Sequence, residues 1–169
     1  PAAPVLGRTV VTGAASGLGR ALAEALGPLR RGLILIDRDH AGLERVCMGR
    51  EGVERVGLDL GNEAEVGAFL NSIVWRRAPI DEIFACAGIG WRGRADSLPY
   101  EALAAVFKVN VLSRLQMIRS VLGSMIARQF GRIVLISSSS AFQALPFMSV
   151  YAASNSALLL FGEGLAAET

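Results

Sequence analysis

Short runs of aliphatic and β-branched residues alternate along the chain with stretches in which apolar residues recur every three or four positions. The runs predict strands, and the stretches predict helices with one buried face. The strands are expected at 8–13, 32–37, 53–60, 80–88 and 131–139. The helices are expected at 17–29, 41–48, 63–74, 101–109, 111–127 and 151–168.

This regular alternation indicates an α/β protein with a parallel sheet and helices on both of its faces. The run 32–37 (GLILID) has little polar alternation, which is typical of a strand covered on both sides. Right-handed crossovers favour a Rossmann-like, doubly wound strand order of 3-2-1-4-5. The chain has no internal repeat or linker, so we expect a single domain over residues 1–169.

The last predicted helix, 151–168, is apolar around most of its circumference. A helix of this kind needs burial on more than one side, often at a subunit contact. Together with the long helix 111–127 it forms a candidate interface, and we expect a homodimer or homotetramer.

Composition favours a globular domain, because the 169 residues are 52% hydrophobic and 19% charged. The net charge is only +2, and the arginines occur in scattered pairs such as Arg30-Arg31 and Arg76-Arg77. We expect these arginines to lie on solvated surface, and we expect no nucleic-acid partner.

The sequence indicates neither a metal site nor a disulfide framework. Cys47 and Cys86 form no CxxC pair, and His40 is the single histidine. No stretch reaches the ~18 apolar residues of a membrane span, and the start of the chain (PAAPVLGR) lacks the pattern of a signal peptide. We therefore expect a cytoplasmic protein with no membrane partner.

A glycine-rich loop, TGAASGLGR (12–20), connects the first predicted strand to the first helix. Gly13, Gly17 and Gly19 permit a tight turn, close approach of the backbone to a pyrophosphate, and close packing of helix on strand. The following helix N-terminus presents free N–H groups to the phosphates. We expect Ser16 and Leu18 of the same loop to contact a dinucleotide as well; the alternative is an ordinary tight turn.

Asp37 ends the second predicted strand, 18 residues after Gly19. A carboxylate at this place accepts hydrogen bonds from the adenosine ribose and repels a 2′-phosphate. Ser16 brings no positive charge to offset that repulsion, whereas the neighbouring Arg38 is the one feature that favours a phosphate. We therefore expect NAD to be preferred over NADP.

Further features lie at the ends of the later predicted strands and in the helical segments between and after them. They are Leu58-Asp59-Leu60, Cys86-Ala87-Gly88, Asn110 within KVNV (108–111), and Ser138 located 13 positions before Tyr151. With the glycine loop, they resemble the short-chain dehydrogenase/reductase family over the whole chain. Where the family usually reads NNAG, this chain reads Ala85-Cys86-Ala87-Gly88, so the asparagine pair is absent.

The resemblance implies an oxidoreductase that transfers a hydride between NAD(H) and a small-molecule alcohol or ketone. It implies that Tyr151 is the acid/base, that Ser138 holds the substrate oxygen, and that Asn110 steadies the long helix and a water relay. Taken alone, Tyr151 is interpreted equally well as a tyrosine on a helix face with an ordinary hydrogen bond.

The resemblance also implies which residues contact the cofactor away from the glycine loop. Asp59 and Leu60 correspond to the family's adenine contact, and Ala87 and Gly88 to the end of its fourth strand.

One catalytic position departs from the family. The family has a lysine four positions after the tyrosine. The charge of this lysine favours the ionised tyrosine, and its amine binds the nicotinamide ribose. This chain has Asn155 there, which can reach a ribose hydroxyl but supplies no charge. A second hypothesis is therefore an inactive nucleotide-binding protein of the same fold, which acts as a sensor or subunit partner.

Apolar residues near the predicted site are open to two interpretations. Phe142, Leu145, Phe147, Met148 and Trp91 either line an apolar substrate pocket or form core or subunit contacts. Family members usually continue beyond the tyrosine helix into two more strands and a substrate loop. We therefore expect sequence beyond the last helix, and the substrate is not identifiable from these residues.

Overall fold

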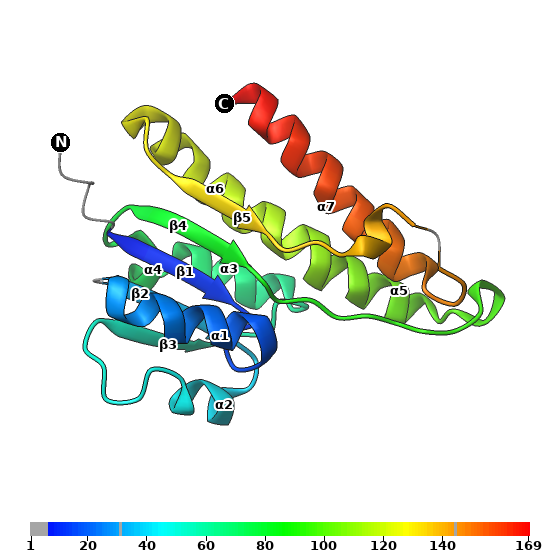
Figure 1. Cartoon of the computed structure of the whole chain (residues 1–169), viewed down its shortest axis with the longest axis horizontal. Helices are drawn as coiled ribbons and strands as arrows, with labels where there is room; N and C mark the ends of the chain where they lie inside the picture. The colour runs from blue at the N-terminus through cyan, green and yellow to red at the C-terminus, as the bar shows by residue number, and fades with distance from the viewer. Residues whose placement is uncertain (1–6, 31, 144) are drawn as a thin grey trace.

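The computed structural model of the protein describes residues 7–30, 32–143 and 145–169. Its centre is a five-stranded parallel sheet with the order β3-β2-β1-β4-β5 (Figure 1), which confirms the predicted topology. The strands are β1 (Arg8–Thr12), β2 (Gly32–Asp37), β3 (Val53–Gly57), β4 (Ile80–Ala85) and β5 (Arg132–Leu135).

The helices cover both faces of this sheet. They are α1 (Gly17–Leu26), α2 (His40–Arg45), α3 (Glu63–Asn71), α4 (Ile73–Arg76), α5 (Tyr100–Phe107), α6 (Ser113–Arg128) and α7 (Ser149–Glu168). In β1, Val10 and Val11 are both fully buried but belong to different hydrophobic clusters, because successive side chains of a strand point to opposite faces. The cluster around Val11 includes Ala23 of α1 and Leu43 of α2, and the cluster around Val10 includes residues of α3, α4 and α6.

The predicted helix 63–74 is wrong as a single element, because the chain breaks at Ser72. This residue is extended, with φ −71° and ψ 160°, and its hydroxyl accepts a hydrogen bond from Trp75 N at 3.3 Å. Ser72 thus ends α3 and caps the short α4, whose Trp75 is buried against Phe69.

The long helix also differs from its prediction. A π-helical turn, Lys108–Leu112, joins α5 directly to α6. In the sequence, Leu122 and Ile126 continue the apolar spacing of this helix, but Ile126 is 54% exposed and the buried positions include Arg114 and Val121. The wider π turn inserts an extra residue, which rotates the face that the following helix buries.

Three strands end at least three residues earlier than predicted. β3 ends at Gly57, β4 at Ala85 and β5 at Leu135, and the chain then continues as loops at the carboxyl edge of the sheet. Such loops at the carboxyl ends of parallel strands are where ligands bind in open α/β sheets.

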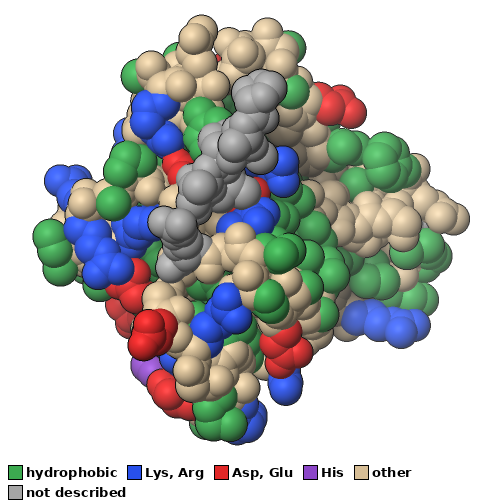
Figure 2. Space-filling view, turned by 60° about the vertical axis from the view of Figure 1, so that its left-hand side comes forward, with side chains coloured by type: hydrophobic (Ala, Val, Ile, Leu, Met, Phe, Trp, Pro, Cys, Tyr) green, Lys and Arg blue, Asp and Glu red, His purple; other side chains and the backbone are tan. Residues whose placement is uncertain are grey.

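The opposite edge, where the strands begin, holds buried ion pairs. Glu82 of β4 is fully buried and lies 2.6 Å from Arg30 Nε and 3.3 Å from Arg132 Nη1, so Arg30 is not the solvated surface residue that we expected. Asp81 pairs with Arg128 at 2.6 Å. Figure 2 shows this side of the molecule, with basic and acidic side chains mixed over it. Arg31 lies outside the described residues.

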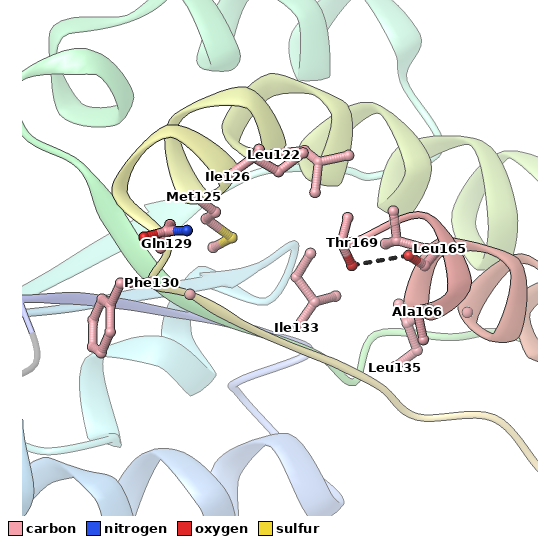
Figure 3. A pocket seen from close by; sticks show the side chains of 12 residues that line it. Leu122, Met125, Ile126, Gln129, Phe130, Ile133, Leu135, Leu165, Ala166 and Thr169 are labelled. Carbon is pink, nitrogen blue, oxygen red and sulfur yellow. Dashed lines mark hydrogen bonds between the residues drawn. The ribbon is translucent and has the colours of Figure 1, made fainter.

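β5 is an edge strand with a groove beside it. Figure 3 shows that α6, β5 and α7 contribute apolar side chains to this groove, including Met125, Ile133 and Leu165, around a cavity of about 530 Å³. None of the residues predicted for catalysis or cofactor binding lines it. Within the described residues, no helix is long and apolar enough to cross a membrane.

Candidate active site

A second cavity, of about 340 Å³, opens at the carboxyl ends of β1, β2 and β4. It lies where the order of the strands changes direction, because β2 is on one side of β1 and β4 is on the other. Its lining includes all eleven residues predicted to contact a dinucleotide. They are Gly13, Ser16, Gly17, Leu18, Gly19, Asp37, Arg38, Asp59, Leu60, Ala87 and Gly88. The structure therefore brings together residues that are 75 positions apart in sequence, from Gly13 to Gly88.

Glycine is required at two positions of the loop between β1 and α1. Gly13 has a φ of +68°, and a Cβ there would lie 2.9 Å from the Cα and N of Ala87. A Cβ on Gly19 would lie 2.1 Å from the carbonyl oxygen of Gly13. The loop therefore packs tightly against both its own helix and the end of β4.

Gly17 differs, because a Cβ there would meet nothing within 4 Å, although its φ is +50°. The backbone at Gly17 thus borders open space at the start of α1. Ser16 precedes α1 as an extended N-cap residue whose side chain makes no capping hydrogen bond. The first N–H groups of α1 and the Ser16 hydroxyl are consequently available to an anion in the cavity.

Asp37 connects β2 to the glycine loop. Its Oδ2 accepts a hydrogen bond from Ala15 N, and its Oδ1 accepts one from Asp39 N, both at 3.0 Å. Because each carboxylate oxygen can accept two hydrogen bonds, the carboxylate keeps capacity for a ligand hydroxyl. Arg38, the next residue, is exposed at the same end of the cavity.

The remaining walls come from the ends of β3 and β4. Asp59 is exposed, and its Oδ1 accepts a hydrogen bond from Gly61 N at 2.8 Å. Sequence reasoning gave no role in the cavity to Cys86, Ile89 and Val109, which also line it. Burial raises the pKa of the Cys86 thiol, which keeps that thiol neutral at physiological pH.

Asn110 lies in the π-helical turn before α6 and is 98% buried, with 2% exposure. Its Oδ1 accepts from Ile89 N, and its Nδ2 donates to Ile89 O, both at 2.9 Å. Nδ2 also donates to Ser154 Oγ at 3.0 Å, and that hydroxyl donates to Tyr151 O at 2.8 Å. Asn110 therefore connects the loop after β4 with the first turns of α7.

Tyr151 lies in the first turn of α7 and is half-buried. Its ring packs beside Gly90, where an added Cβ would lie 3.5 Å from Tyr151 Cδ2. Two hydrogen bonds fasten the segment that follows β5 to the same helix. Ser137 Oγ donates to Asn155 O at 3.1 Å, and Ser156 Oγ donates to Ala141 O at 2.9 Å.

Ser138 lies in this fastened segment, between the two attachment points. Its Oγ accepts a hydrogen bond from Ser140 N at 3.2 Å, so the hydroxyl hydrogen stays available to donate. The fold thus holds the segment of Ser138 against the helix of Tyr151, as the spacing in sequence implied.

Asn155 lies one helical turn after Tyr151 and is 4% exposed. Its Nδ2 donates to Tyr151 O at 2.9 Å, so one of its two amide N–H groups is used on the helix backbone. The cavity lining includes none of the four residues predicted for catalysis, Asn110, Ser138, Tyr151 and Asn155.

Three of the apolar residues near the site, Phe142, Leu145 and Phe147, are exposed, whereas Trp91 and Met148 are half-buried. Phe142 is 78% and Phe147 is 51% exposed, and Gly93 N donates to Phe147 O at 2.9 Å. That bond joins their loop to the loop of Trp91. The core interpretation is therefore wrong for these two phenylalanines, and a substrate pocket or a subunit contact remains.

Arg114 of α6 is a residue that sequence reasoning missed. It is 4% exposed, its Nη1 donates to Ile136 O at 2.7 Å, and its Nη2 donates to Ala87 O. Burial lowers the pKa of this guanidinium to about 10, while Cys86 and Tyr151 favour its charged form. The sequence shows only that Arg114 follows Asn110 by four positions, whereas its place on the buried face of α6 is seen in the structure.

Other charged groups do not form a metal site. Within the described ranges, no three histidine, cysteine or acidic side chains lie together as metal ligands. His40 is exposed, and Lys108 pairs with Glu63 at 3.2 Å.

Comparison with known proteins agrees with this fold. The model of the family "short chain dehydrogenase" matches residues 8–169. The ketoacyl reductase HetN of Nostoc sp. is 29% identical over an alignment of 167 residues that covers 96% of this chain and 58% of HetN. The chain thus spans less than two thirds of that relative.

Solved structures are similar in the same way. A short-chain dehydrogenase from Streptomyces avermitilis has a TM-score of 0.89 at 28% identity, over 98% of this chain and 61% of that one. A metagenomic short-chain oxidoreductase in complex with NADP has a TM-score of 0.87 at 28% identity, over 96% of this chain and 76% of that one. The parallel sheet, the glycine loop at its carboxyl edge and the match over residues 8–169 show that this chain belongs to the short-chain dehydrogenase family.

Proposed function

We propose that the protein is an NAD(H)-dependent oxidoreductase that interconverts a small-molecule alcohol and the corresponding ketone. The observation that carries the proposal is the cavity at the carboxyl edge of the sheet. Its lining includes all eleven residues that the sequence predicted to contact a dinucleotide. Membership of the short-chain dehydrogenase family supports the same class of reaction.

The residues present fit a nicotinamide dinucleotide. The open space at Gly17 admits a pyrophosphate next to the backbone, and the N-terminus of α1 offers N–H donors without a competing acidic side chain in its first turn. When bound, the nicotinamide supplies the hydride acceptor or donor. The chain itself has to orient the substrate and move one proton.

Three side chains are suited to those tasks. Tyr151 exchanges the proton at the substrate oxygen, and Ser138 donates a hydrogen bond to that oxygen. Asn110 holds the first turns of α7 in place through Ser154, and so positions Tyr151. Phe147 and the neighbouring exposed apolar side chains favour an apolar substrate, or else bury against a second subunit.

The preference for NAD(H) rests on Asp37. A 2′-phosphate would meet a carboxylate that is fixed by hydrogen bonds to Ala15 N and Asp39 N, at the cost of like-charge repulsion. Arg38 opposes this effect, but it is exposed and its charge is screened by solvent. One similar solved structure contains NADP, so the affinities of this protein for NADH and NADPH should be compared directly.

A second function is supported by one observation. Asn155 is a neutral amide and provides no cation at the position where the family has a lysine. A protein of this fold that binds NAD(H) without turnover, as a sensor or a subunit partner, would have the same cavity.

Turnover separates the two functions. Oxidation of NADH should be measured with a panel of aliphatic and aromatic ketones, for the wild type, Tyr151→Phe and Ser138→Ala. The proposed function predicts turnover that Tyr151→Phe removes while NADH still binds. NADH binding with no turnover on any ketone, in either direction, would support the second function instead.

A further inference from the structure

The hydrogen-bond ladder between β4 and β5 ends at the wall of the cavity. Ile136 N donates to Ala85 O at 3.2 Å, in line with the parallel register of the two strands. A regular parallel ladder would next join Ala87 N to Ile136 O, and then Ser138 N to Ala87 O. Ala87 N instead donates to Thr12 Oγ1 of β1 at 3.1 Å, and within the described residues neither of the two bonds forms. The carbonyl oxygens of Ile136 and Ala87 therefore need other donors.

Arg114 of α6 donates to both of these carbonyl oxygens. Its Nη1 binds Ile136 O at 2.7 Å, and its Nη2 binds Ala87 O. The side chain is 4% exposed, so the guanidinium is enclosed between the two chain segments. The fork of a guanidinium is planar and rigid, and it therefore fixes the spacing of the two carbonyl groups that it binds. A guanidinium inserted between two backbone segments also keeps them farther apart than a direct hydrogen bond would.

Both segments that Arg114 holds belong to the site. Ala87 and Gly88 line the cavity, and a Cβ on Gly88 would lie 3.2 Å from Nη2 of Arg114. On the other side, Ile136 precedes Ser138 by two residues. Arg114 thus lies behind the cavity wall and connects it to the segment of Ser138.

The arrangement is costly if it serves only to stabilise the fold. Nε of Arg114 is buried and has no hydrogen-bond partner in the described structure, and no ion pair found among the described residues includes Arg114. Two backbone hydrogen bonds would join the same segments without burying a charge, whose incomplete pairing costs free energy. Arg8, the other buried arginine, lies 3.6 Å from Glu54. The cost at Arg114 is therefore better explained by a function in the site.

We propose that Arg114 is a positioning residue, which sets the distance between the wall of the dinucleotide cavity and the segment that carries Ser138. This role rests on the proposed function, because it places the bound cofactor relative to the hydroxyl that holds the substrate oxygen. Without the fork, the two carbonyl groups lose their common donor, and the two segments become free to move relative to each other.

Hydrogen exchange tests this role without any ligand. The amides of Ala87 and Ile89 are hydrogen-bonded to Thr12 Oγ1 and to Asn110 Oδ1, so their exchange reports how firmly the cavity wall is held. In Arg114→Gln, both amides should exchange about tenfold faster or more, measured by NMR relative to a central amide of β2. Unchanged relative exchange in a folded Arg114→Gln protein would overturn the proposal.

Arg8 provides a matched control for the loss of a buried arginine. It is 8% exposed and donates to Trp75 O and Ala78 O, at the edge of the sheet opposite the cavity. Arg8→Gln should destabilise the protein but leave the exchange of Ala87 relative to β2 and the affinity for NADH unchanged. Equal effects of both substitutions on these two quantities would show that Arg114 is only structural.

Calorimetric titration with NADH gives the second readout. Arg114→Gln should weaken NADH binding by about tenfold, and Arg114→Lys should weaken it less, because lysine keeps the charge but loses the fork. In Arg114→Ala, millimolar guanidinium should restore part of the affinity, whereas sodium chloride at the same concentration should not. NADH affinity equal to that of the wild type in Arg114→Gln would overturn the proposal. If Arg114→Gln does not fold, Arg114→Lys replaces it, and unchanged exchange and affinity in that variant would overturn the proposal in the same way.

Turnover separates this role from the proposed function. With a ketone and NADH, Arg114→Gln should lower kcat by a larger factor than it changes the KM of the ketone, because Ser138 is displaced from the reacting oxygen. The predicted order of NADH affinities without turnover on any ketone would contradict only the oxidoreductase. If the wild type did not bind NADH, the proposed function would be contradicted, and hydrogen exchange would decide whether Arg114 holds the two segments.

Discussion

Gly19→Ala is expected to disrupt the contact between α1 and β1 on which the cavity is built. The new Cβ would lie 2.1 Å from the Gly13 carbonyl oxygen, 2.7 Å from the Gly13 carbonyl carbon and 3.0 Å from the Thr12 carbonyl oxygen. Ordinary van der Waals contact begins at 3.4 Å, so the loop backbone must move by more than about 1 Å. All three atoms belong to the backbone and no side chain can rotate away to relieve the clash.

The magnitude follows from the cost of overpacking. Inserted methyl groups in packed regions cost about 1–3 kcal/mol, and a clash with backbone alone favours the upper end, about 3 kcal/mol. The moved loop also shifts the N–H groups at the start of α1. We therefore expect the affinity for NADH to fall by at least about tenfold, or about 1.4 kcal/mol.

Two other glycines provide matched controls. In Gly17→Ala the new Cβ would meet no atom within 4 Å, but the residue would have to keep a left-handed φ of +50°. This substitution should therefore lower the stability by about 1–2 kcal/mol and also weaken NADH binding. Gly67→Ala lies in α3 with open space around it and should stabilise the protein by about 0.5–1 kcal/mol, without effect on NADH.

Urea unfolding followed by circular dichroism measures the stability changes, and fluorescence titration measures NADH binding. A Gly19→Ala protein as stable as the wild type would refute the close contact between α1 and the end of β1.

Asp37→Ala should narrow the difference between NADH and NADPH affinity, measured by fluorescence titration of both cofactors; an unchanged ratio would remove the carboxylate from its assigned role. Burial raises the pKa of both Cys86 and Cys47, so fewer thiolates form at a given pH, and alkylation by iodoacetamide should be slow near neutral pH and still accelerate above about pH 8.5. NADH should protect Cys86, which lines the cavity, but not Cys47, as read by peptide mass spectrometry; equal protection would place the ligand elsewhere. We also expect a homodimer or homotetramer with α6 and α7 in the contact, and a monomer in sedimentation at micromolar concentration would count against it.

The sequence was sufficient for the strand order and for the cavity because both depend on local signals. Short aliphatic runs alternate with helical periodicity, and this alternation leaves few topologies. Gly13 and Gly19 are at positions where a Cβ would clash with the backbone, so the spacing of these glycines in the sequence predicts the tight turn. The place of Asp37 beside the glycine loop could be predicted because the carboxyl ends of β1 and β2 are neighbours in the sheet.

The features that sequence reasoning missed depend on contacts between distant segments. After the break at Ser72, Trp75 Nε1 donates a hydrogen bond to Ser120 Oγ at 3.0 Å. The two residues are far apart in the sequence, so the spacing of apolar residues within one helix could not predict this contact. The π-helical turn Lys108–Leu112 rotated the buried face of α6, so Arg114 was not identified as part of the site. Its two carbonyl partners, after β4 and β5, become neighbours only once the sheet has formed.

The most direct test of the central claim is calorimetric titration of the purified protein with NADH and, separately, with NADPH. The cavity between the glycine loop, Asp37 and the end of β4 predicts one NADH site per chain, with NADPH bound more weakly. Absence of binding for both dinucleotides up to about 1 mM, a Kd that corresponds to about 4 kcal/mol, would contradict a dinucleotide site at this edge of the sheet.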